Sequence, residues 1–90
     1  IARFAADPGA RAALARFETT GQVSDPIVTL HTSGEPIVPV AHQGLYAAKV
    51  EAAGAGALLD EDVVARYGHC TFEQGEVLSA FGTLVDRATP

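Results

Sequence analysis

The amino-acid sequence predicts an α/β fold built on a parallel sheet, and three observations carry this prediction. Apolar residues make up 48% of the 90 residues and charged residues 19%, which is typical of a packed chain rather than a disordered one. Two short β-branched runs alternate with three helical patterns. The last of these patterns is clearly amphipathic. Strands that alternate with helices pair in parallel, because the helix carries the chain back to the start of the sheet.

The first helix is expected to start at Asp7 and to run to Thr19. Asp7 is a good N-cap, and Pro8 fits the first helical position, where its missing N–H costs nothing. Gly21 then ends the helical pattern. The apolar face of this helix is expected to consist of Ala13, Leu14 and Phe17.

The first strand is predicted at Ile27–His31, a short apolar and β-branched run that opens after Pro26. The following segment, Thr32–Ala41, is expected to be a loop at the carboxyl end of this strand. It contains three residues that interrupt regular structure: Gly34, Pro36 and Pro39.

The middle of the chain predicts a second helix at His42–Ala53 and a second strand at Val63–Tyr67. Leu45, Ala48 and Ala52 are spaced to form one face of this helix. The strand breaks at Gly68, and Gly68–Phe72 is expected to be a second loop.

The last helix has the clearest period in the sequence, and it is expected to pack on the sheet. Its apolar positions are Val77, Leu78, Phe81, Leu84 and Val85, with Glu76, Ser79, Thr83 and Asp86 facing away. Two strands are too few for a sheet that is covered on both faces, since each would keep an unpaired edge. We therefore expect residues 1–90 to be one partial α/β domain, with the rest of the sheet supplied from elsewhere.

A carboxylate and a histidine are predicted to meet at one edge of this sheet. Glu35 follows the first strand and His69 follows the second, and parallel strands bring their carboxyl ends to the same edge. Adjacent strands lie about 4.8 Å apart, so the two side chains can reach hydrogen-bonding distance. An acid that orients a histidine makes a general base. Two solvated loop residues are the alternative interpretation of the same pair.

Two motifs favour the catalytic interpretation. The stretch Pro26–Pro39, PIVTLHTSGEPIVP, resembles the α/β-hydrolase segment in which a strand ends in a G-D-x-x-V-P type loop that bears the catalytic acid. Arg66–Phe72, RYGHCTF, resembles the later loop in which a Gly-His pair presents the catalytic histidine before the final helix. The resemblance implies the roles of acid for Glu35 and of base for His69, in the family's order of serine, acid, histidine. It departs at Glu35, where the family usually has Asp.

The nucleophile of such an enzyme is missing from these motifs. None of Ser24, Ser33 and Ser79 lies in a G-x-S-x-G turn, so the serine is expected upstream of Ile1. Cys70 directly follows the candidate base and lacks a strand-to-helix turn of its own, so we expect a small residue that is at least partly buried. The 90-residue chain alone is expected to be inactive.

The remaining candidates for chemistry are expected to have structural roles. His31 and His42 have no metal-ligand spacing with a carboxylate, so neither a metal nor a cofactor is predicted. Gly34 and Gly68 are expected to let the two loops turn sharply. The single cysteine excludes an internal disulfide and leaves the compartment open.

Charge and hydropathy exclude two classes of partner. The net charge is −5 and no cluster of Lys or Arg occurs, so nucleic acid is not an expected partner. No apolar run approaches the roughly 20 residues that span a bilayer. The expected substrate is a small-molecule or peptide ester or amide, and the expected partner is the upstream part of the same hydrolase domain.

Three hypotheses for the function stay open at this point. The first is the acid and histidine end of a serine hydrolase that acts by acyl transfer. The second is a non-catalytic α/β fragment or interaction module, with Glu35 in place of Asp as a sign of lost activity. The third, a nucleotide-binding domain, is disfavoured because neither strand is followed by G-x-G-x-x-G.

Overall fold

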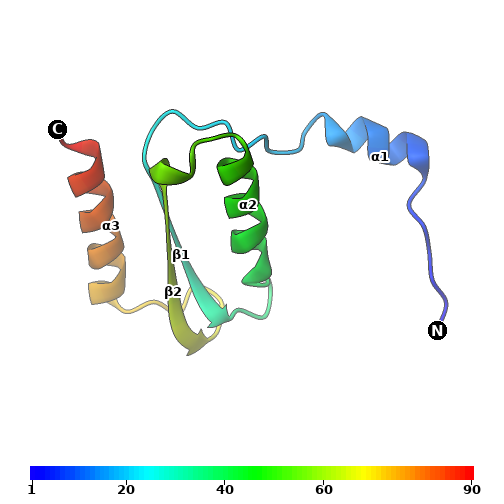
Figure 1. The fold of residues 1–90 in the computed structure, drawn as a ribbon. Coiled ribbons are helices and arrows are strands. Elements are labelled where there is room, and N and C mark those ends of the chain that lie inside the picture. The colour runs from blue at the N-terminus through cyan, green and yellow to red at the C-terminus, as the bar shows by residue number, and fades with distance from the viewer.

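The computed structural model describes all of residues 1–90 and has mixed helices and strands around a two-stranded parallel sheet (Figure 1). In chain order the elements are α1 (Pro8–Ala15), β1 (Ile27–Gly34), α2 (Ala41–Ala52), the short 3-10 helix η1 (Gly56–Leu58), β2 (Leu59–Tyr67) and α3 (Gln74–Ala88). The predicted alternation of three helices with two parallel strands is found, with η1 as an additional short element, and this arrangement is compatible with the α/β class.

The two strands are direct neighbours and run in parallel, from Ile27 opposite Leu59 to Gly34 opposite Tyr67. Both are longer than predicted, because β1 continues to Gly34 and β2 already begins at Leu59. The apolar pattern missed the start of β2 since its first residues include three acids. Backbone pairing tolerates charged side chains on an edge strand.

Gly34 has a different role from the predicted turn. It lies in β1, beside an irregularity in the pairing, and a Cβ atom added there would lie 3.2 Å from the Cα atom of Tyr67. The glycine therefore permits the close approach of β2 rather than a change of direction.

Helix α1 forms where it was predicted to start but ends at Ala15, four residues before the predicted end. The Asp7 carboxylate caps it by accepting from the Ala10 N–H at 2.9 Å. Figure 1 shows α1 extending away from the strands, and none of its residues is buried. The apolar face of this helix is therefore open, with Leu14 69% and Phe17 79% exposed.

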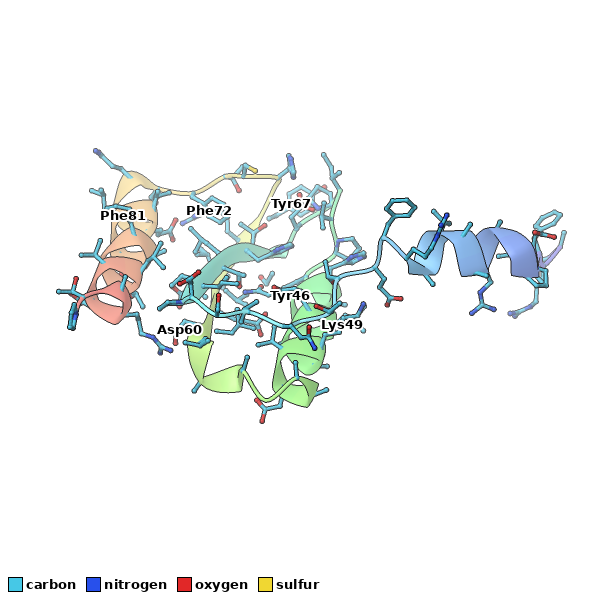
Figure 2. All side chains as sticks on the ribbon, turned by 90° about the horizontal axis from the view of Figure 1, so that it is seen from above. Tyr46, Lys49, Asp60, Tyr67, Phe72 and Phe81 are labelled. Carbon is cyan, nitrogen blue, oxygen red and sulfur yellow. The ribbon has the colours of Figure 1, made fainter.

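Helices α2 and α3 lie on opposite sides of the two strands, as both views show (Figures 1 and 2). The bounds of α2 agree with the prediction to within one residue at each end. The contact faces of both helices differ from their predictions. In α2 the buried residues are Gln43 and Val50, while the predicted face is exposed, with Leu45 at 64%.

The final helix differs from its prediction in the same way. In α3 the buried residue is Ala80, and Glu76 and Thr83, which were predicted to face away, are half-buried. Four of the predicted core residues are 44% to 62% exposed: Val77, Leu78, Phe81 and Val85. Periodicity identifies an apolar face, but a two-stranded sheet is too narrow to cover it, so both helices keep apolar faces that nothing in this chain covers.

Candidate active site

Glu35 and His69 meet at the edge where both strands end. Glu35 follows the last residue of β1, and His69 lies two residues after the end of β2. The Nδ1 atom of His69 lies 2.5 Å from the Oε1 atom of Glu35. The Glu35 side chain is only 5% exposed, whereas that of His69 is 48% exposed. The structure thus brings together the two side chains that the sequence singled out, one enclosed and one open to solvent.

The loop between β1 and α2, residues 35–40, is called the acid loop below, and its backbone binds the Glu35 carboxylate. Its Oε2 atom accepts hydrogen bonds from the backbone N–H of Ile37, at 2.9 Å, and from that of Val38. Burial acts to raise the pKa of Glu35, but the N–H of Val38, the His69 ring and the N–H of Ile37 together outweigh it, so that its pKa is below the usual value. Glu35 is therefore an anion at neutral pH.

The ionised state of Glu35 decides which nitrogen of His69 carries hydrogen. A carboxylate only accepts hydrogen bonds, so Nδ1 of His69 donates to Oε1. In the neutral imidazole the other nitrogen, Nε2, then carries the lone pair. This is the tautomer that a general base needs when a proton approaches at Nε2.

The loop that carries His69, Gly68–Phe72, is called the histidine loop below. It turns directly at the end of β2, and residues of β1 hold it by hydrogen bonds. Gly68 has a φ of 129°, a region that suits glycine, and its N–H donates to the Gly34 carbonyl at 3.2 Å. The hydroxyl of Thr32, which is fully buried, donates to the Gly68 carbonyl at 2.7 Å. The predicted turn at Gly68 is confirmed, and β1 holds both sides of this residue.

Arg66 holds the same loop from the side of α3. Its guanidinium pairs with both carboxylate oxygens of Glu76, at 2.6 and 3.1 Å, and donates to the Thr71 carbonyl at 2.8 Å. Glu76 also accepts from the N–H of Glu73, within a capping box at the start of α3. The Arg66 pairing and, after it, this N–H lower the pKa of Glu76. One side chain thereby ties the end of β2, the loop and the final helix together.

Sequence reasoning missed Thr32, Arg66 and Glu76 as supports of the site. A signal for one of them was present, because Glu73 and Glu76 have the spacing of a capping box. The partnership of Arg66 with Glu76 had no local signal, since the two residues meet only when the helix packs beside the strand.

Cys70 lies beside the histidine and is exposed, which corrects the expectation of a partly buried residue. Its backbone φ of 55° is in the left-handed region, which is uncommon for a residue other than glycine. The Sγ atom lies 3.8 Å from the Nε2 atom of His69.

The other histidines and the serines are placed as follows. His31 bonds through Nε2 to the Val38 carbonyl at 2.8 Å, and His42 is exposed in the first turn of α2. Ser24 contacts Asp25 at 3.4 Å, Ser33 lies in β1 and Ser79 in α3.

A pocket of about 170 Å³ opens beside the pair. It contains no serine, and its lining consists of Leu30, His31, Thr32, Glu35, Val38, His69, Cys70 and Phe72. Figure 2 labels Tyr67 and Phe72, which flank the histidine loop. A larger, open hollow of about 610 Å³ is lined only by α1 and Glu18. The larger hollow borders neither loop, so the smaller pocket is the one next to Glu35 and His69.

No group of three or more His, Cys, Asp or Glu side chains is arranged to hold a metal ion. None of the helices has the length and apolar character required to cross a membrane. Comparison with protein-family models, with curated proteins and with solved structures finds no match for the chain.

Proposed function

We propose that this chain is the C-terminal part of an α/β-hydrolase domain, in a serine hydrolase that cleaves ester or amide bonds by acyl transfer. Glu35 orients the catalytic histidine, and His69 is the general base. The observation that carries the proposal is the 2.5 Å contact between His69 Nδ1 and Glu35 Oε1 at the carboxyl edge of two parallel strands.

The proposed reaction uses the free nitrogen of His69. Nε2 takes the proton from a serine hydroxyl in the upstream part of the domain, and the serine oxygen forms a bond to the carbonyl carbon of the substrate. Glu35 stabilises the imidazolium that results. The imidazolium then gives its proton to the leaving alcohol or amine as the bond to that group breaks. Water, activated by the same histidine, hydrolyses the acyl-serine and regenerates the enzyme.

The uncovered surfaces of the chain also support the proposal. Only five of the 90 residues are buried, and α3 exposes Val77, Leu78, Phe81 and Val85. In an α/β domain, helices cover a sheet of several strands, and their apolar faces are buried against it and against each other. Further strands and helices of the same domain would cover these faces, and they would bring the nucleophile to His69.

The test is covalent labelling of the intact gene product with a fluorophosphonate probe, followed by mass spectrometry of its peptides. The probe is expected to label a serine in a G-x-S-x-G turn upstream of Ile1. His69→Ala is expected to abolish labelling and the hydrolysis of p-nitrophenyl esters. His42→Ala is the matched control, since His42 is exposed on α2, and it should leave both unchanged.

Three results would contradict the proposal. One is labelling that survives His69→Ala. Another is a labelled residue inside the 90 residues, which would place the nucleophile next to the base. The third is a gene product that starts at Ile1 and has no esterase activity, since it would lack any serine in the required turn.

A second candidate function is a non-catalytic interaction module, and the observation that favours it is the same exposed face of α3. In that case the intact product would hydrolyse no ester or amide, and His69→Ala would have no effect on its activity. Replacing Phe81 with Ser would instead weaken its association with a partner protein. The labelling experiment separates the two candidates, because only the hydrolase reacts with the probe.

A further inference from the structure

His31 is a titratable residue that the proposed mechanism does not use, and it reaches into the acid loop. It lies in β1, opposite Val63 of β2, and its Nε2 atom is 2.8 Å from the Val38 carbonyl oxygen. A carbonyl oxygen only accepts hydrogen bonds, so Nε2 of His31 carries hydrogen and donates it. That nitrogen is therefore engaged with the backbone of the acid loop.

Val38 connects this histidine to the catalytic acid. Its carbonyl accepts from His31, and its N–H donates to the Oε2 atom of Glu35. Pro39 follows, and a residue before proline is restricted to extended conformations. With the carbonyl held and the dihedral angles restricted, the direction of the Val38 N–H is restricted as well.

The direction of this N–H decides how the carboxylate is turned. Oε2 of Glu35 is occupied by the N–H groups of Ile37 and Val38, and Oε1 is left for His69. If the Val38 N–H moved away, the carboxylate would lose one of its two backbone donors on Oε2 and could rotate. His69 would then lose a fixed acceptor for its Nδ1–H.

We propose that His31 is a positioning residue for the acid: by holding the Val38 carbonyl it keeps the Val38 N–H on Glu35 Oε2 and leaves Oε1 directed at His69. The effect on catalysis rests on the proposed hydrolase function. The coupling of His31 to the Glu35 carboxylate does not, and it can be measured without turnover.

The experiment compares three variants of His31 in the intact gene product, each checked for native folding. His31→Gln places an amide N–H at a reach similar to that of Nε2, whereas His31→Asn is one carbon shorter and His31→Phe has no donor. The readout is the pKa of Glu35, from ¹³C NMR of its carboxyl carbon as the pH is varied. His42→Phe is the control, because His42 is exposed and lies outside the acid loop.

The Glu35 pKa is expected to rise in His31→Phe and His31→Asn and to stay near the wild-type value in His31→Gln and His42→Phe, because a lost backbone donor makes the anion less favourable. The titratable side chains beside the Glu35 carboxylate are His69, which contacts it, and His31 and Cys70, which line the same pocket. The Asn and Gln variants both lack the His31 ring, so the contrast between them isolates the hydrogen-bond donor. If His31→Phe fails to fold, the difference in Glu35 pKa between His31→Asn and His31→Gln is sufficient to test the inference. In the active enzyme, kcat should fall up to about a hundredfold in His31→Asn, with KM nearly unchanged and with rescue by Gln.

Two outcomes would overturn the inference. An unchanged Glu35 pKa in folded His31→Asn would show that His31 does not control the carboxylate. A rise that His31→Gln shares would show that the ring matters for packing rather than for its N–H. If the intact product has no activity that depends on His69, the hydrolase proposal fails, while the carboxyl titration still tests the role of His31.

Discussion

The two loops of the site are held in opposite ways. The acid loop is held mainly by its own backbone, because its N–H groups bind the Glu35 carboxylate. His31 of β1 adds one hydrogen bond to the Val38 carbonyl. The histidine loop makes few bonds of its own and is instead held by neighbours, namely Thr32 of β1 and Arg66 at the end of β2. Glu35 is 5% exposed and His69 is 48% exposed.

This difference separates the two tasks of an acid and a base. An acid that only orients and stabilises benefits from a fixed and enclosed position, whereas a base must present one nitrogen to a reactant. The acid loop can therefore be rigid, because its own N–H groups and His31 of β1 hold it. The histidine loop depends on supports that leave one side of the ring open. The predictions below test this contrast in the intact enzyme.

The largest effect is expected from removing the exposed partner of the pair. His69→Ala should lower kcat by a factor on the order of 10⁴ or more, because no other group can take the serine proton. Steady-state kinetics on a preparation free of host esterases will measure it. Turnover near the wild-type level would remove His69 from the mechanism.

Changes to the enclosed partner should cost less. In Glu35→Gln the amide oxygen has to face the two backbone N–H groups, so its NH₂ faces Nδ1 and forces the hydrogen of His69 onto Nε2. The loss in kcat should be roughly ten- to a hundredfold smaller than for His69→Ala. Glu35→Asp should also lose activity, since the shorter side chain cannot reach His69 and both N–H groups together. Full activity of the Asp variant would show that the loop merely tolerates Glu35.

The external support of the histidine loop should matter for rate more than for binding. Arg66→Met keeps the length of the side chain but loses the contacts to Glu76 and to the Thr71 carbonyl. We expect kcat to fall by up to about a hundredfold as His69 becomes misplaced, with little change in KM. Lys49→Met is the matched control, because Lys49 pairs with Glu18 away from the site. Equal effects of both variants would contradict the assignment.

The histidine loop should also be sensitive to a single methyl group. Gly68→Ala adds a Cβ atom about 2.6 Å from Thr71 Cγ2 at a φ of 129°, and it should lower the free energy of unfolding by about 1–3 kcal/mol. Gly44→Ala in α2 meets no atom within 4 Å, and it should raise that free energy by about 0.5–1 kcal/mol. Urea denaturation of the two variants compares them directly. A stabilising Gly68→Ala would show that the loop does not need this backbone conformation.

The smallest effect concerns pH. The pKa of Glu35 is lowered in the folded state, so its ionised form stabilises the fold above its ordinary value of 4.5, and this contribution is lost as the pH falls through the lower folded value. The stability difference between wild type and Glu35→Gln should therefore be constant above about pH 5 and shrink only in stronger acid. Chemical denaturation at several pH values measures it. A difference that already shrinks near neutral pH would mean that the N–H groups do not hold the carboxylate.

Much of the fold follows from local features of the sequence. Asp7 and Pro8 define the start of α1, the β-branched run after Pro26 defines β1, and the capping box at Glu73 agrees with the start of α3. These features act within a few residues, so a sequence reveals them. The ends of the strands could not be predicted as well from the sequence. Pairing with β1 extends β2 toward its N-terminus over three acidic residues that have no apolar strand pattern.

The sequence alone determined the element types and their order, and it placed Glu35 and His69 after neighbouring strands, since parallel strands end at one edge. The tertiary structure decided what supports them. Thr32 meets the Gly68 carbonyl because β1 and β2 pair, and Arg66 meets Glu76 only when α3 packs beside the strands. It also decided which helix faces are covered, because burial depends on the width of the sheet beneath a helix and not on the period of its apolar residues.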